Sequence, residues 1–180
     1  MEHMNLFFNR IIRAAKLDAN LYEEVEADKG ALGQAAGVVV LSSIAAGLGA
    51  ATTTGFNGIL MGTLVALIGW CIWAYIAYLV GTKILPEPQT KADYGELLRT
   101  IGFSSSPGLI RVFGIIPGFL WPVSMIASIW MIAAMVIAIR QALDYKSTSR
   151  AIGVCIIGWV IQILFFILFF AILGSPGQPA

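Results

Sequence analysis

Long apolar stretches without charged residues constrain this chain more than any other feature of its sequence. Residues 33–51, 58–80, 121–139 and 151–173 contain no Asp, Glu, Lys or Arg. Each stretch reaches the roughly 18–20 residues that an α-helix needs to cross the hydrocarbon core of a bilayer. A soluble fold of 180 residues could not bury all four, since 58% of the chain is hydrophobic and only 12% is charged. The sequence therefore predicts an all-α, polytopic membrane helical bundle.

A fifth apolar stretch, residues 98–116, is interrupted by polar and helix-weakening residues. Three serines precede Pro107, and Arg111 lies five residues before the end of the stretch. Proline removes a backbone hydrogen bond from a helix, and the three glycines of this stretch weaken the helix further. We therefore expect a helix that is broken by its Pro, Ser and Gly residues.

The distribution of Lys and Arg indicates whether this fifth stretch crosses the membrane. If it does, ten of the eleven Lys and Arg residues lie on one side, in the N-terminal tail and in the loops after residues 80 and 139. If it does not, the basic segment 140–150 lies outside, which contradicts the rule that cytoplasmic loops carry the excess of Lys and Arg. We therefore predict five transmembrane helices, the third one broken, with the N-terminus cytoplasmic and the C-terminus outside.

The first thirty residues differ from the rest because they are rich in charge. A helix over residues 5–19 would place apolar residues on one face and Arg13 and Lys16 on the other, with Arg10 beside them. This pattern is typical of an amphipathic helix at a membrane surface, where Arg10, Arg13 and Lys16 would contact anionic lipid. The alternative is a helix packed on its own protein. The acidic segment 20–29 follows, so the tail can hold a partner or fold on itself.

These patterns divide the chain into three regions. We expect a cytoplasmic N-terminal tail with an interfacial helix at residues 1–30, a transmembrane domain at residues 31–173 and a disordered tail at residues 174–180.

The inventory of reactive side chains argues against an enzyme. The one histidine is His3, and no Asp or Glu lies within a predicted span, so a catalytic base, a carboxylate pair and a His-containing metal site have no place to form. We expect no cofactor and no metal. A net charge of +1 makes nucleic acid an unsuitable partner.

Arg111 is the one ionisable residue at membrane depth, and such a residue requires a partner. One interpretation is structural: the side chain reaches outer-leaflet phosphates or donates to carbonyls freed by the helix break. The other interpretation is a site for an anion or a lipid headgroup, formed by Arg111, Ser104, Ser105, Ser106 and Gln162.

Two segments carry a resemblance to a known family. They are Asn20-Leu21-Tyr22-Glu23-Glu24-Val25-Glu26, before the first span, and Leu97-Leu98-Arg99-Thr100-Ile101-Gly102-Phe103-Ser104-Ser105-Ser106-Pro107, leading the third. With the five-span layout, they resemble the Yip (Ypt-interacting protein) family in its short prokaryotic type. The resemblance implies a cytoplasmic N-terminal region followed by a five-helix membrane domain.

The sequence and this resemblance together suggest two functions. The first is a non-enzymatic membrane-organising or partner-recruiting module in the bacterial cytoplasmic (inner) membrane. Its expected partners are membrane lipids, a cytoplasmic protein at the tail, and other subunits of a homo- or hetero-oligomer. The second is a small oligomeric transporter or channel for an anion or lipid, built around the broken third helix.

Overall fold

The computed structural model describes residues 2–173, except the side chains of residues 2–3, 52–54, 165–166 and 168–173. Every regular element in this range is a helix, which confirms the all-α prediction. The disorder predicted for residues 174–180 lies outside the described residues. The elements are α1 (Glu2–Ala15), α2 (Ala19–Ala27), η1 (Lys29–Ala31), α3 (Leu32–Gly49), α4 (Ala51–Leu79), η2 (Val80–Ile84), α5 (Tyr94–Phe103), η3 (Ser106–Ile115), α6 (Leu120–Ala142) and α7 (Thr148–Leu173).

The long helices coincide with the apolar stretches of the sequence. Among the described residues, three segments are long and apolar enough to cross a membrane: Lys29–Gly49, Gly55–Ile84 and Leu120–Ala142. The described apolar part of α7, Thr148–Leu164, is shorter. The helix α4 is kinked at Gly55, whose φ of 62° suits glycine and disfavours residues with a Cβ. The chain is therefore an integral membrane protein.

The fifth apolar stretch forms two helices of different type. Asp93 caps α5 and forms a capping box with Glu96. The α-helix ends at Phe103, and a 3₁₀ helix, η3, begins at Ser106 with Pro107 in its first turn. The predicted break is therefore present, because proline is compatible with the start of a helix and not with its interior.

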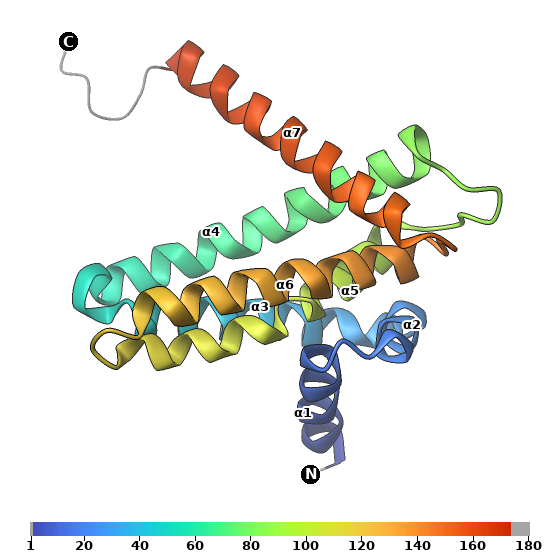
Figure 1. The fold of residues 1–180 in the computed structure, drawn as a ribbon. Helices are drawn as coiled ribbons and strands as arrows, with labels where there is room; N and C mark the ends of the chain where they lie inside the picture. Colours follow the sequence, from blue (N-terminus) through green and yellow to red (C-terminus); the bar gives the residue numbers. More distant parts are fainter. Residues whose placement is uncertain (1, 174–180) are drawn as a thin grey trace.

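Together α5 and η3 run alongside α3 in the same direction. Gly102 lies against Ala35, Gly108 against Ser42 and Gly114 against Gly49. The chain then turns and returns as α6 beside η3 (Figure 1). The broken third stretch therefore follows α3 from near its beginning to its last residue, instead of folding back halfway.

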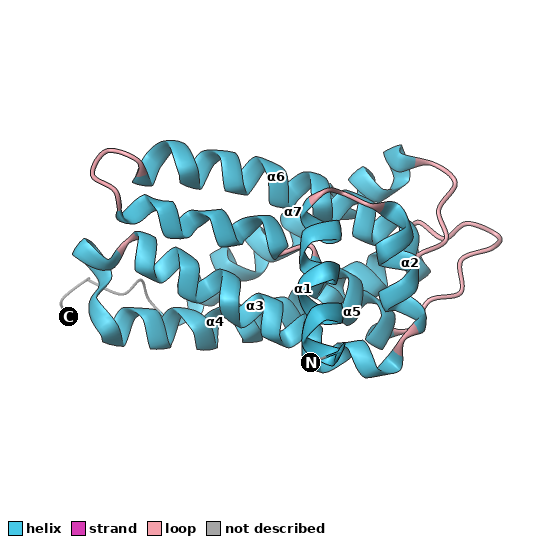
Figure 2. Ribbon diagram, turned by 90° about the horizontal axis from the view of Figure 1, so that it is seen from below, coloured by secondary structure: helices cyan, strands magenta, loops and turns pink. Residues whose placement is uncertain are grey.

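The remaining helices frame this centre from two sides. α7 meets α4 at Gly158, which lies against Trp73, and the two helices diverge towards the C-terminal end of α7 (Figure 1). α1 lies across the long helices, and α2 lies towards the end of the bundle where α5 begins (Figures 1 and 2). One buried cluster joins α4, α5, α6 and α7, and a second joins α1 and α2 to α3 and α5.

Candidate functional site

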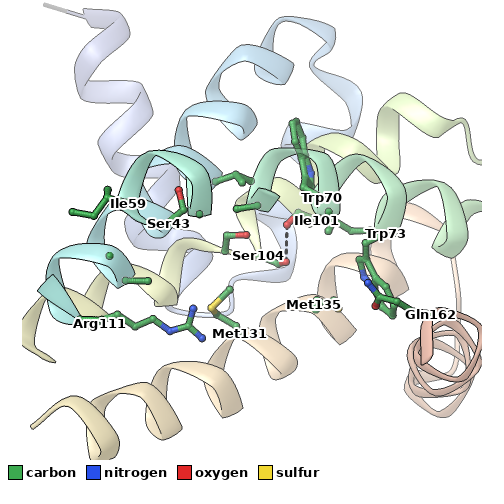
Figure 3. Close-up of a pocket in the computed structure, with 18 of the residues that line it drawn as sticks. Ser43, Ile59, Trp70, Trp73, Ile101, Ser104, Arg111, Met131, Met135 and Gln162 are labelled. Atoms are coloured by element: carbon green, nitrogen blue, oxygen red, sulfur yellow. Dashed lines mark hydrogen bonds between the residues drawn. The ribbon is translucent and has the colours of Figure 1, made fainter. Parts of the chain in front are cut away.

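A groove of about 610 Å³ lies among α3, α4, α6, α7 and the broken third stretch (Figure 3). One side of α4 forms its wall with small residues, namely Gly58, Gly62, Ala66 and Gly69. These residues recur every three or four positions, so they share one helix face and leave room beside it. Nothing lies within 4 Å of the position that a Cβ on Gly62 would occupy.

Four of the five residues predicted to form an anion or headgroup site line this groove: Arg111, Ser104, Ser105 and Gln162. Ser104 donates its hydroxyl to the carbonyl of Ile101 at 2.7 Å (Figure 3). Ser106 does not line the groove. It is buried and donates to the carbonyl of Phe103 at 2.7 Å, so it caps the end of α5.

The Arg111 side chain extends between the helices and not towards the outer end of the bundle. Its Nη2 donates to Ser128 Oγ at 3.0 Å. Ser128 lies eight residues into α6 from Leu120, which is about 12 Å along that helix. Figure 3 shows the guanidinium directed towards Met131. The structure thus shows a bond to α6, and the predicted contact with outer-leaflet phosphates stays a prediction.

The charge of Arg111 has no counter-ion in the part of the chain that the structure describes. None of the ion pairs there includes Arg111. A guanidinium has five N–H donors, and the bond to Ser128 uses one of them. The groove therefore presents a cation with unused donors.

A second unused donor in the groove wall belongs to Trp73. Its ring is 7% exposed, and its Nε1 has no hydrogen-bond partner among the described atoms. The neighbouring Trp70, by contrast, donates its Nε1 to the carbonyl of Leu98 at 3.0 Å. The sequence gives no sign of this free N–H, because it results only from the way the helices pack.

The groove holds no arrangement suited to metal-dependent chemistry. Within the described range, no three His, Cys, Asp or Glu side chains lie together. The polar groups of the groove are hydrogen-bond donors, hydroxyls and one amide. Such groups bind oxygen-bearing ligands and supply no evident general base.

Comparison with known proteins shows the family of the chain. A family model, the Yip1 domain, matches residues 19–170. The chain belongs to the Yip1 family. The resemblance seen in the sequence is thus confirmed. No curated protein and no solved structure matches the chain.

The Yip1 match begins at α2, and α2 is attached to the membrane helices. Arg99 of α5 is buried, and it donates to the carbonyls of Val25 and Glu26 at the end of α2, with 2.9 Å between Nε and the Val25 oxygen. From α6, Gln141 donates to Glu23 at 2.7 Å. Burial, with repulsion from nearby carboxylates, raises the pKa of Glu26 to about 7. The start of the Yip1 domain is thus part of the folded bundle.

Ahead of the Yip1 domain, the two arginines of α1 are engaged by α2. Arg10 is 4% exposed and pairs with Glu24 at 2.9 Å and Asp28 at 2.8 Å. Arg13 pairs with Glu24 and with Asp18, and this holds the pKa of the Asp18 carboxyl below its usual value. The tail therefore folds on itself, which was one of the two expected outcomes.

The predicted contact of Arg10, Arg13 and Lys16 with lipid stays a prediction, and Lys16 is the exposed member of the three. The helix expected over residues 5–19 also differs in detail. It ends at Ala15, Leu17 turns with a φ of 62°, and Asp18 caps α2 through the backbone N–H of Asn20.

Proposed function

We propose that this Yip1-family protein is a non-enzymatic, five-pass organiser of the bacterial cytoplasmic membrane. The observation that carries the proposal is α1, an amphipathic helix that lies across the membrane-crossing helices (Figure 1). A helix in this orientation occupies the area of one leaflet without spanning it. The protein would act by inserting α1 as a wedge into the cytoplasmic leaflet. α2 would offer a surface to a cytoplasmic partner. The exposed spans would offer a surface to other subunits.

The path of the broken third stretch supports five crossings. It follows α3 as far as Gly49, and α6 returns beside it, so successive helices alternate in direction. This arrangement places the loop at residues 116–119 at one end and the loop at residues 143–147 at the other. The N-terminus and ten of the eleven cations would then be cytoplasmic, in agreement with the positive-inside rule.

Cysteine labelling tests this topology directly. In a background without Cys71 and Cys155, we expect a cysteine at Phe119 to react with an impermeant thiol reagent in right-side-out vesicles. A cysteine at Lys146 should react only after the vesicles are opened, because it lies at the cytoplasmic end. Detergent-opened vesicles provide the control for access at both positions. Labelling at Lys146 in sealed vesicles, with protection at Phe119, would contradict five crossings that begin from a cytoplasmic N-terminus.

The exposure of α1 supports its insertion into lipid. Met4, Phe8 and Ile12 lie four residues apart on one edge of α1, where Phe8 and Ile12 are more than half exposed. The adjacent edge packs on the protein, where Phe7 contacts α3 at Gly37. Gly37 lies five residues, or about 7.5 Å, into α3. This depth agrees with the roughly 5–10 Å at which interfacial helices lie.

Replacement of both Phe8 and Ile12 by Gln tests the wedge. We expect the full-length parent to reduce the diameter of reconstituted phosphatidylethanolamine–phosphatidylglycerol vesicles, measured by electron cryomicroscopy. The double variant should lose most of this effect, because each apolar side chain contributes about 1.5–3 kcal/mol to burial. Replacing Asn5 and Asn9, on the polar edge of α1, is the control. The same diameters for parent and double variant would refute membrane organisation by α1.

A second function is favoured by the groove. Arg111, with unused donors, lies in a groove between helices, as a carrier or channel for an anion or lipid would require. Such a protein could assemble as an oligomer through its exposed spans. This candidate concerns a different part of the molecule from α1, so the two functions can be tested separately.

A further inference from the structure

The groove extends along α4. Its wall extends from Gly58 to Trp73, fifteen residues along α4, which corresponds to about 22 Å. Its volume of about 610 Å³ is in the range of small-molecule sites, roughly 300–1,000 Å³. The groove is therefore long enough for an extended ligand.

The polar groups of the groove lie at two levels. The guanidinium of Arg111 is bonded to Ser128 of α6. Seven residues, or about 10 Å, further along α6 lies Met135, which packs against the cluster that contains Trp73. Arg111 and the unpartnered Nε1 of Trp73 therefore lie at two different levels of the groove.

Arg111 carries charge and has donors beyond the one bonded to Ser128, while the neutral Nε1 of Trp73 is buried without a partner. A buried N–H without a partner is rare and costly, so each such group calls for an explanation. The cation at Arg111 suits an oxygen with full negative charge, while the neutral indole N–H of Trp73 suits a carbonyl or ester oxygen. Most other lining groups are aliphatic, aromatic or thioether side chains, or glycine.

The groove also lies between α4 and α7, which diverge towards the end of α7 (Figure 1). An apolar chain attached to a ligand in the groove would lie along the apolar lining that these two helices supply. Free phosphate would satisfy Arg111 but would leave the N–H of Trp73 and the apolar wall without a partner. The features together fit an amphiphile better than a small anion.

We propose that this groove binds one anionic glycerophospholipid, with its phosphate against Arg111 and an acyl ester oxygen against Trp73. The inference rests on the second candidate function and names its ligand. A three-carbon glycerol unit separates phosphate and ester in such a lipid, so one molecule can meet both donors. The phosphate points towards the outer end of the bundle, which is the orientation of an outer-leaflet lipid.

Native mass spectrometry of the full-length protein in detergent with added phosphatidylglycerol tests the proposal. The parent should retain one phosphatidylglycerol. Arg111→Gln should weaken retention by about tenfold, and Trp73→Phe, which removes the N–H and keeps an aromatic ring, by about threefold. Lys91→Gln and Trp121→Phe, which change exposed residues outside the groove, are the matched controls and should behave as the parent.

Gly62→Leu separates loss of ligand from loss of folding. The added side chain enters open space, so the melting temperature should stay the same or rise while phosphatidylglycerol is lost. Equal retention by parent, Arg111→Gln and Gly62→Leu would overturn the proposal. The lipid assignment would be overturned if excess inorganic phosphate displaced the lipid and also bound equally well when no lipid was present.

The vesicle-diameter measurement keeps this inference distinct from membrane organisation by α1. Arg111→Gln should deform vesicles as the parent does, because Arg111 is not part of α1. Phe8 and Ile12, conversely, do not line the groove, so their replacement should leave phosphatidylglycerol retention unchanged. Failure of one proposal thus leaves the other standing.

Discussion

Replacement of Gly49 by alanine is expected to lower the free energy of unfolding by about 3 kcal/mol. A Cβ on Gly49 would lie 2.1 Å from the backbone oxygen of Arg111 and 3.1 Å from its carbonyl carbon. Both atoms belong to the backbone of η3, so no side-chain rotation relieves the clash. The 3₁₀ helix must move away from α3, and the contacts between these two elements are lost together.

Chemical or thermal unfolding in detergent micelles measures this effect, and Gly62→Ala is its control. Gly62 is also a helical glycine among the membrane-crossing elements, but no atom lies near its added Cβ. Alanine there should stabilise the protein by up to about 1 kcal/mol, because it has the higher helix propensity. If the two variants unfold alike, close approach of α3 and η3 does not determine stability.

The Gly49 contact also bears on the groove, because the residue in contact is Arg111. A Cβ on Gly49 would displace the backbone oxygen of Arg111, and the side chain of Arg111 enters the groove. Any movement of η3 therefore moves the guanidinium relative to Ser128, its partner on α6. Gly49 thus fixes the position of Arg111 without touching a ligand itself.

The long helices and the helix break could be predicted from sequence because the physical requirements are local. A bilayer demands a minimum apolar length, and each of the four uninterrupted stretches met it. Proline at position 107 cannot supply a backbone donor, so the α-helix had to end before it. The capping box of Asp93 and Glu96 is a local requirement of the same kind, because its residues lie three apart at the start of α5.

The contacts of the N-terminal tail could not be predicted in the same way. Helical periodicity places Arg10 and Arg13 near one another, but it does not say what faces them. Their partners include Glu24, which lies on the next helix, beyond a turn that depends on Leu17 adopting a left-handed conformation. Such a conformation is unfavourable for leucine, so the sequence gave no signal for the turn.

The groove was partly predictable for a related reason. Arg111 and the serines before Pro107 were singled out because polar groups at membrane depth require partners, and Gln162 because its amide is polar within a span. The structure brings Arg111, Ser104, Ser105 and Gln162 to one groove. Ser106 could not be excluded in advance, since its hydroxyl direction depends on where the carbonyl of Phe103 lies.

The docking of α2 on the membrane helices yields the second large effect. Arg99→Met keeps the aliphatic part of the side chain but removes the guanidinium, and with it every donor to the carbonyls of Val25 and Glu26. Those carbonyls end α2, where the helix dipole also favours a cation. Because hydrogen bonds to charged groups contribute about 1.5–3 kcal/mol each, we expect docking to weaken by about 3 kcal/mol.

Hydrogen exchange of the full-length protein in micelles measures this loss where it occurs. Amides of α2 should exchange about 100-fold faster in Arg99→Met, while those of α3 and α6 keep the parent rates, because the spans do not depend on α2 for their own helical bonds. Arg150→Met is the matched control: it removes an arginine that is half exposed, pairs with Glu87 and makes no contact with α2. Unchanged exchange in α2 would mean that the buried side chains of Leu21, Tyr22 and Val25 hold it in place without Arg99. The polar contact would then fix only the orientation of α2, not its attachment to the bundle.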